Sequence, residues 1–224
     1  MVRFRLGSAL TLGLLTLLTG CINPEIRDAA AFASQLVGAH TYEVDVHEQA
    51  TGNVYRLQIS DASWNKQFNK EDIVSVCALA FYNHLPNTSD VGYVSVAIDS
   101  NLGEIQKTFS SSELQQAYKS IDRVTSFFRW HPKAGIDSLR PLVNPLFFPD
   151  SLIDKIAQSV LQQDSLDNGF VKTEMIGFEL DTVAQLPVVI VKLSAIRKQS
   201  RQRYDAFVGA MDERLLLVVP AKND

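Results

Sequence analysis

Residues 174–183 read EMIGFELDTV and residues 188–197 read VVIVKLSAIR, and two further apolar runs follow, RYDAFVGAM at 203–211 and RLLLVVP at 214–220. Short β-branched and aromatic runs separated by turn residues are typical of consecutive antiparallel strands. The preceding stretch, DSLIDKIAQSVLQQ at 150–163, repeats apolar residues at helical spacing. The C-terminal half is therefore predicted to be a helix plus a three- to four-stranded antiparallel meander. We expect the stripe Leu152, Ile156 and Val160 to pack on that sheet.

The N-terminal half also mixes helices and strands. A helix is predicted over 25–39, and TYEVDVHEQ (41–49) alternates polar and apolar residues before a second strand at 52–60, as in a hairpin. A second helix is expected from Asn69 to about Leu85. Two more strands are expected at 91–99 and 104–110, followed by a helix that opens with a Ser110–Glu113 capping box. The fold class is therefore α+β, with helices packed on antiparallel sheets.

Prolines divide the chain. Pro132, Pro141, Pro145 and Pro149 fall within 20 residues, a density that disfavours a regular element. We expect a connector there, between regions that pack either separately or as one body. The predicted organisation is 1–20 signal peptide, 21–40 modified N-terminus and short helix, 41–131 α+β region, 132–149 proline-rich connector, and 150–224 helix plus antiparallel sheet.

The N-terminus has the pattern of a secretory signal. Arg3 and Arg5 precede an apolar run over 6–18, which is too short to span a bilayer. The run ends in Leu18, Thr19, Gly20 and Cys21, and small residues before a cysteine suit a processing peptidase. These four residues resemble the lipobox of bacterial lipoproteins.

The resemblance implies that Cys21 becomes the N-terminus and carries acyl chains. Each buried methylene contributes about 0.8 kcal/mol, and two or three chains make a stable anchor. Membrane lipid, reached through Cys21, is then the expected partner, and the cell envelope is the expected location. In the sorting rule of some two-membrane bacteria, an Asp after the cysteine retains the protein at the inner membrane. Because Ile22 stands there, the outer membrane is favoured if one exists, and otherwise the outer face of the cell membrane.

The element order from Phe147 to Pro220 is similar to the second half of the nuclear transport factor 2-like and cystatin-like superfamilies. That resemblance implies a curved sheet around a helix, with room for a cavity. It implies no function by itself, because one fold serves many activities.

Charge argues against nucleic acid as a partner. Removal of the first 20 of 224 residues leaves 204 and takes away two arginines, which moves the formal net charge from −4 to −6. Binding to phosphate backbones requires clustered Lys and Arg. No cofactor-binding or hydrolase motif is present in the sequence, so no cofactor, catalytic residue or metal ligand is assigned.

Four groups of residues remain as candidates for chemistry. Glu43, Asp45 and His47 share one strand face, which favours a solvated strand face over a metal site. Cys77 lies in an apolar helical run and is expected in the core. The aromatic residues Phe127, Phe128 and Trp130 are expected to pack under the connector. A basic group is expected at an exposed hairpin tip, with attraction to anionic headgroups as the alternative role; it comprises Arg197, Lys198, Arg201 and Arg203.

The sequence thus predicts a membrane-anchored envelope lipoprotein that binds a partner or small ligand without catalysis. A hydrolase or other enzyme with scattered catalytic residues is one alternative. A structural or assembly subunit with a flat apolar patch is the other.

Overall fold

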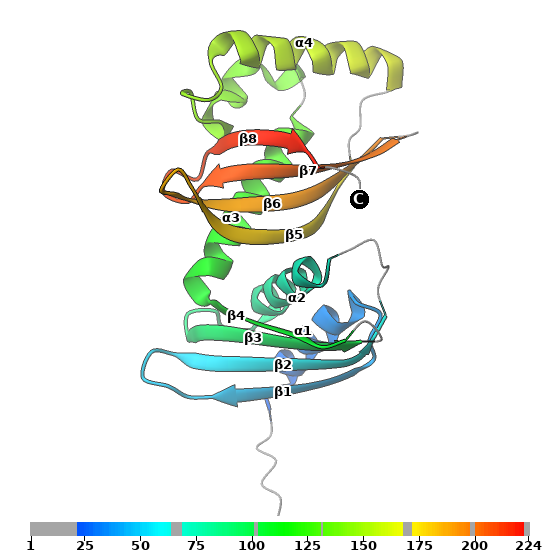
Figure 1. The fold of residues 1–224 in the computed structure, drawn as a ribbon, viewed down its shortest axis with the longest axis vertical. Helices are drawn as coiled ribbons and strands as arrows, with labels where there is room; N and C mark the ends of the chain where they lie inside the picture. Colours follow the sequence, from blue (N-terminus) through cyan, green and yellow to red (C-terminus); the bar gives the residue numbers. More distant parts are fainter. Residues whose placement is uncertain are drawn as a thin grey trace, which may run out of the picture.

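The computed structural model describes residues 22–63, 69–100, 103–130, 132–167, 172–197 and 200–221, apart from the side chains of 132, 160–167, 197 and 200. Two four-stranded sheets form the body, sheet A with strand order β1-β2-β3-β4 and sheet B with order β5-β6-β7-β8 (Figure 1). The predicted α+β class is confirmed.

Sheet A combines two antiparallel pairs with one parallel pair. Strands β1 (Thr41–His47) and β2 (Asn53–Ala62) form the predicted antiparallel hairpin, and β3 (Val91–Ser100) and β4 (Ile105–Ser110) form another. Strands β2 and β3 pair in parallel. The reason is α2, which connects them, because a helical crossover returns the chain in the same direction.

Two helices cover one face of sheet A. Helix α1 (Pro24–Gln35) begins at Asn23, whose side chain accepts a hydrogen bond from the Glu25 amide, and Pro24 occupies its first turn. Helix α2 (Lys70–His84) has Asn69 as its N-cap, as predicted. Helix α2 is apolar on most sides because it lies between sheet A and β5 of sheet B.

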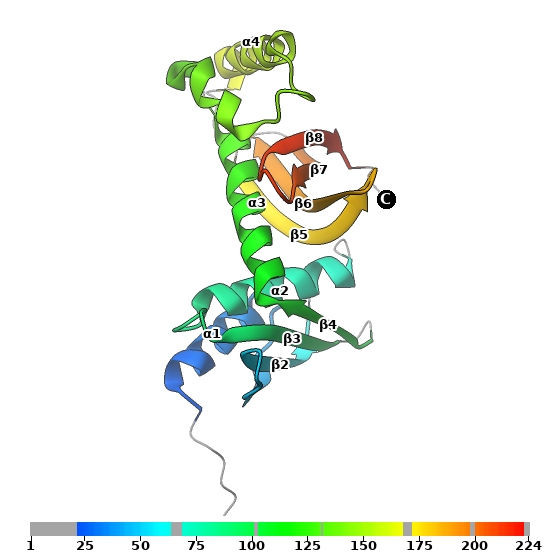
Figure 2. The same cartoon turned by 90° about the vertical axis from the view of Figure 1, so that its left-hand side faces the viewer.

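Helix α3 (Ser111–Arg129) runs from sheet A to sheet B (Figure 2). Its predicted capping box is present: Ser110 Oγ accepts from the Glu113 amide at 3.3 Å, and Glu113 Oε2 accepts from the Ser110 amide at 2.6 Å. Beyond α3, the proline-rich segment forms three short 3-10 turns, η1 (Pro132–Ala134), η2 (Ile136–Ser138) and η3 (Arg140–Leu142).

Sheet B is the predicted antiparallel meander. Its strands are β5 (Lys172–Val183), β6 (Leu186–Arg197), β7 (Ser200–Gly209) and β8 (Leu215–Pro220). One face is apolar and buried, with Phe178, Val191 and Ala206 in the core. A single hydrophobic core cluster contains residues of both sheets, and the rings of Phe109 and Phe178 join them at 5.4 Å between centroids.

The helix that covers sheet B is α3, and this differs from the predicted packing. Helix α4 (Asp150–Asp167) instead packs on η1 and η2. Leu152 is 38% exposed, whereas Ile153 and Ala157 are 3% and 5% exposed, so the buried stripe is rotated from the predicted one. The side chain of Val160 lies outside the described residues. Because α3 already occupies the apolar sheet face, α4 has no access to it.

Candidate functional site

The first candidate group is a solvated strand face, as expected. Glu43, Asp45 and His47 are exposed on β1, and Val44 between them is buried. In the described part of the chain, no three His, Cys, Asp or Glu side chains are placed to hold a metal ion.

The second and third candidates lie in the interior. Cys77 is fully buried, and burial raises the pKa of its thiol to about 12, so at neutral pH it is not a nucleophile. Phe127 and Phe128 pack against Phe148 and Tyr204 respectively. Trp130 Nε1 donates to the Gly135 carbonyl and to Ser138 Oγ, so Phe127 and Trp130 pack against the connector as expected, whereas Phe128 packs on β7 of sheet B.

The predicted anchor residue and part of the predicted basic group lie outside the described residues. Cys21, Lys198 and the side chain of Arg197 lie outside the described residues. Arg201 is exposed on β7 and forms an ion pair with Glu174 of β5. Arg203 also lies on β7 but is half-buried, so it is not at an exposed hairpin tip as predicted. None of the described helices has the length and hydropathy needed to cross a membrane.

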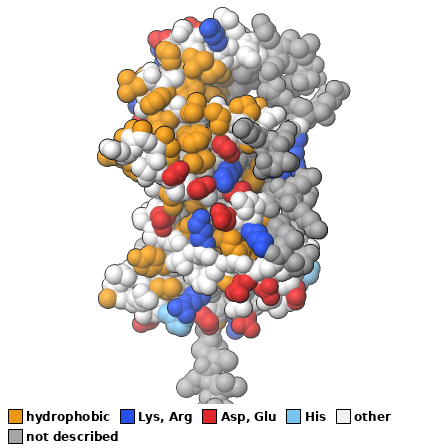
Figure 3. All heavy atoms as spheres, in the orientation of Figure 1, with side chains coloured by type: hydrophobic (Ala, Val, Ile, Leu, Met, Phe, Trp, Pro, Cys, Tyr) orange, Lys and Arg blue, Asp and Glu red, His pale blue; other side chains and the backbone are white. Residues whose placement is uncertain are grey.

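The two halves of the molecule differ in the polarity of their exposed side chains. Figure 3 shows hydrophobic side chains gathered over the half that holds sheet B, with charged side chains over sheet A and the region between the sheets. Leu146 and Met211 are each 86% exposed. We call the exposed aliphatic residues and Phe147 of this half the apolar surface: Leu146, Phe147, Leu152, Val183, Leu186, Met211 and Leu217.

Sheet A has a second face, turned away from α1 and α2, that we call the open face. Alternation along each strand sends core residues such as Leu57 and Val96 toward the helices and polar residues to the opposite side. Register then brings the polar residues together: Arg56 is the partner of Ser95, and Ser95 is the partner of Thr108.

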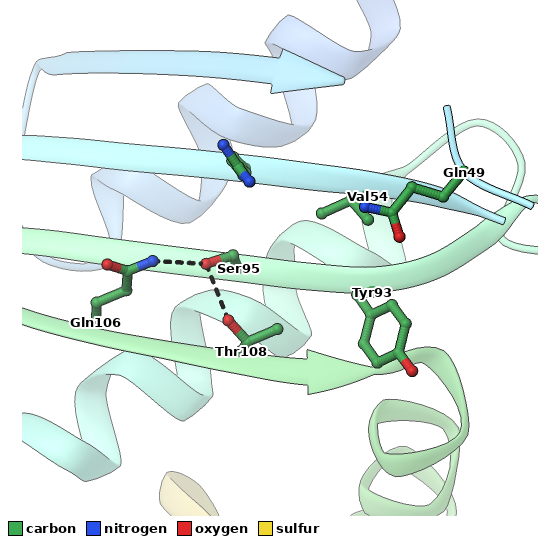
Figure 4. A pocket seen from close by; sticks show the side chains of 7 residues that line it. Gln49, Val54, Tyr93, Ser95, Gln106 and Thr108 are labelled. Carbon is green, nitrogen blue, oxygen red and sulfur yellow. Dashed lines mark hydrogen bonds between the residues drawn. The ribbon is translucent and has the colours of Figure 1, made fainter. Parts of the chain in front are cut away.

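A hollow of about 330 Å³ lies on the open face, near the end of the β1–β2 hairpin. Figure 4 shows its lining side chains on β2, β3 and β4 and on the loop after β1. Except for Val54 they are polar or carry a polar end; the full set is Gln49, Val54, Arg56, Tyr93, Ser95, Gln106 and Thr108.

Ser95 is the centre of a hydrogen-bonded group within the hollow. Its Oγ accepts from Gln106 Nε2 and from Thr108 Oγ1, each at 3.1 Å (Figure 4). A hydroxyl has two acceptor lone pairs and one donor proton. With both lone pairs occupied, the Ser95 proton is the remaining hydrogen-bonding group of that side chain.

Arg56 supplies the positive charge of the hollow. Within the described part of the chain it makes no ion pair at 4.0 Å or less. Its cross-strand partner on β1 is Asp45, one of the residues that the sequence singled out. Glu43 and His47 share this face but, like Asp45, do not line the hollow.

Sequence reasoning did not identify Arg56, Ser95, Gln106 or Thr108 as site residues. The available signal was their position on the polar side of three predicted strands. That signal was insufficient because neighbours across a parallel pair are set by the crossover helix, not by local alternation.

Comparison of the chain with family models, curated proteins and solved structures finds no match.

Proposed function

We propose that this protein is a lipid-anchored protein of the bacterial envelope that binds a small polar ligand on the open face of sheet A, without catalysis. The observation that carries the binding proposal is the hollow around Arg56 and Ser95. The resemblance of Leu18–Cys21 to a lipobox supports the anchor and, with Ile22 after the cysteine, favours the outer membrane where one exists.

The length of the linker supports a membrane-proximal role for sheet A. Only Ile22 and Asn23 separate Cys21 from the first residue of α1, a span of about 10 Å when extended. The start of α1 lies at the end of the molecule opposite α4 (Figures 1 and 2). With acyl chains on Cys21, sheet A would be held near the bilayer and sheet B would project from it.

The residues of the hollow favour binding over catalysis. Of its seven lining residues, only Arg56 and Tyr93 are ionisable. The guanidinium of an arginine is a permanent cation in proteins and does not act as a general acid or base. Ser95 and Thr108 have no histidine or carboxylate among the lining residues to activate them, so the hollow lacks a nucleophile–base pair.

The apolar surface favours a second candidate function, that of a subunit docking on a protein partner. Large contiguous exposed apolar patches often mark interaction sites. Replacement of Leu146 and Met211 with Asp should then release the protein from a larger assembly on native gels after mild detergent extraction. Tyr118→Asp, on the 56% exposed Tyr118 of α3, is the control that should remain in the assembly.

The anchor is tested by cell fractionation. We expect Cys21→Ser to move the protein from the membrane to the soluble fraction, or to leave its signal segment uncleaved. Normal cleavage with full membrane retention would contradict the anchor.

The binding role is tested by thiol labelling of single substitutions. In Thr108→Cys, a dialysable extract of the cell envelope should slow maleimide labelling of the new thiol, because a ligand in the hollow covers it. Buried Cys77 does not compete for the reagent. Tyr118→Cys is the matched control that should label at the same rate with and without extract. If the extract left the labelling rate of Thr108→Cys unchanged, as it should for Tyr118→Cys, ligand binding on the open face would be contradicted.

A further inference from the structure

We propose that the hollow on the open face of sheet A recognises a sugar ring bearing a carboxylate. This inference rests on the proposed function, in which that face is a binding site, and it adds the chemical class of the ligand.

The carboxylate of the ligand is inferred from the presence of Arg56 in the hollow. A guanidinium has five N–H donors in a planar fork that fits a carboxylate with two parallel hydrogen bonds. Arg56 stands in the hollow without an ion pair to any described residue. The Ser95 hydroxyl lies on the neighbouring strand at the partner position of Arg56 and adds a donor toward the same ligand.

The charge around Arg56 favours a carboxylate over a phosphate ester. Asp45 is the cross-strand partner of Arg56 and lies on the same face of the sheet, so a negative charge is present in the neighbourhood of Arg56 although the two side chains form no ion pair. A phosphate monoester would bring a charge of about −1.5 to −2 to this position, whereas a carboxylate brings a single charge. The closer charge balance is therefore with a monoanion.

The rest of the lining suits hydroxyl groups. Each glutamine amide offers two donors and a carbonyl acceptor, and Gln106 commits only one of its N–H groups, to Ser95, among the described residues. Gln49 stands at the other end of the hollow in Figure 4. Groups that both donate and accept at short spacing match the hydroxyls of a sugar ring.

An aromatic ring completes the site. Tyr93 lines the hollow and is 41% exposed, and Val54 is the partner of Tyr93 across the β2–β3 pair. The electron-rich face of an aromatic ring packs favourably on the weakly positive C–H groups of a sugar face. The volume of about 330 Å³ is near the lower limit for small-ligand sites and favours a single ring over a long chain.

The test uses the full chain in detergent and isothermal titration with glucuronate, glucose and acetate. We expect saturable binding of glucuronate and much weaker binding of the other two. Glucose lacks the carboxylate, and acetate lacks the sugar ring. Arg56→Gln should weaken glucuronate binding about 10- to 100-fold, the loss expected for a charged hydrogen bond. Arg27→Gln, on the exposed face of α1, should leave binding unchanged. Tyr93→Ala should weaken binding while Tyr118→Ala should not.

The possible failures are distinguishable. No glucuronate binding, equal binding of glucose or acetate, or equal losses in Arg56→Gln and Arg27→Gln would each overturn the assignment of an acidic sugar. If the envelope extract protects Thr108→Cys from labelling but the protein does not bind glucuronate, this ligand class would be refuted. The proposed binding function would still be supported. Absence of both effects would refute the binding function as well. Thermal melting of each variant establishes that a loss of binding is not a loss of folding.

Discussion

Lys192 Nζ on β6 lies 2.7 Å from Asp72 Oδ1 on α2, so a largely buried ion pair links the helix layer of sheet A to sheet B. The contact requires a close approach of the two elements. A Cβ atom on Gly177 would lie 2.6 Å from the Asp72 Cβ, and Ser75 Oγ of α2 accepts a hydrogen bond from the Phe178 amide at 3.0 Å. This junction therefore sets how α2 sits on β5.

Asp72→Ala should destabilise the protein by about 1.5–3 kcal/mol, because it leaves the partly buried Lys192 ammonium without its principal partner. Urea unfolding at pH 7 measures the change. Lys119→Ala is the control: its ion pair with Glu213 is exposed, and the expected loss is below about 1 kcal/mol. Equal losses in the two variants would show that the junction contributes no more than a surface pair.

Asp205 gives the junction a pH dependence. Burial raises the pKa of Asp205 from its ordinary value of 3.8, opposed by Lys192 and reinforced by the charges of Asp72 and Glu179. The folded state therefore holds this proton more tightly, and stability is lost as pH rises from 3.8 through the raised pKa. Asp205→Asn should be more stable than the parent at pH 7, with the gain vanishing below about pH 3.8. A gain that persists unchanged at pH 3 would contradict this account.

Lys192 acts at the opposite end of the pH range. Burial alone would lower the pKa of Lys192, but the hydrogen bond and charge of Asp72, with a further contribution from Glu179, raise it above 10.5. Its stabilising contribution is complete below pH 10.5 and is lost as pH rises through the folded-state pKa. Lys192→Met should therefore flatten the decline of stability above that pH, as followed by thermal melting. An unchanged slope would argue against the ion pair as its source.

Cys77 should be inert in the folded protein. In the Cys21→Ser chain it is the remaining thiol, and its burial and raised pKa of about 12 leave almost no accessible thiolate. We expect a thiol reagent at pH 8 to modify it only in denaturant. Fast labelling of the native chain would contradict its place in the core and favour an enzymatic role.

The capping box at the start of α3 should make a measurable contribution. Ser110→Ala removes the side-chain acceptor for the Glu113 amide, and loss of such a cap costs about 0.5–2 kcal/mol. Ser112→Ala, two residues into the same helix end, should have a smaller effect. Chemical denaturation measures the free energy of unfolding of both variants. An equal loss in the two would mean that the Ser110 cap does not account for the destabilisation.

The basic residues should be dispensable for folding. Arg201 and Glu174 form an exposed pair, so Arg201→Gln should change stability by less than about 1 kcal/mol. Neutralising Arg197, Lys198 and Arg201 together, with the half-buried Arg203 left unchanged, should likewise shift the melting temperature little. A large shift would place some of these side chains in the interior.

Much of the local structure followed from the sequence by itself. Asn69 and Ser110 start their helices because a side-chain oxygen can satisfy an amide only a few residues away. The meander of sheet B was predictable because consecutive antiparallel strands need only short turns between them. These interactions join residues close in the chain, so short stretches of sequence carry the information.

The partners of each element across the fold were decided only by the tertiary structure. Alternation placed Arg56, Ser95 and Thr108 on polar strand faces, but their union in one hollow required the parallel β2–β3 register, which α2 imposes. The choice of α3 over α4 as cover for sheet B also depended on competition for one apolar surface. Hydrophobic burial is non-directional and stabilises the contact of any two complementary apolar faces. Which faces meet therefore depends on the packing of the whole molecule, and it cannot be inferred from any single stretch of sequence.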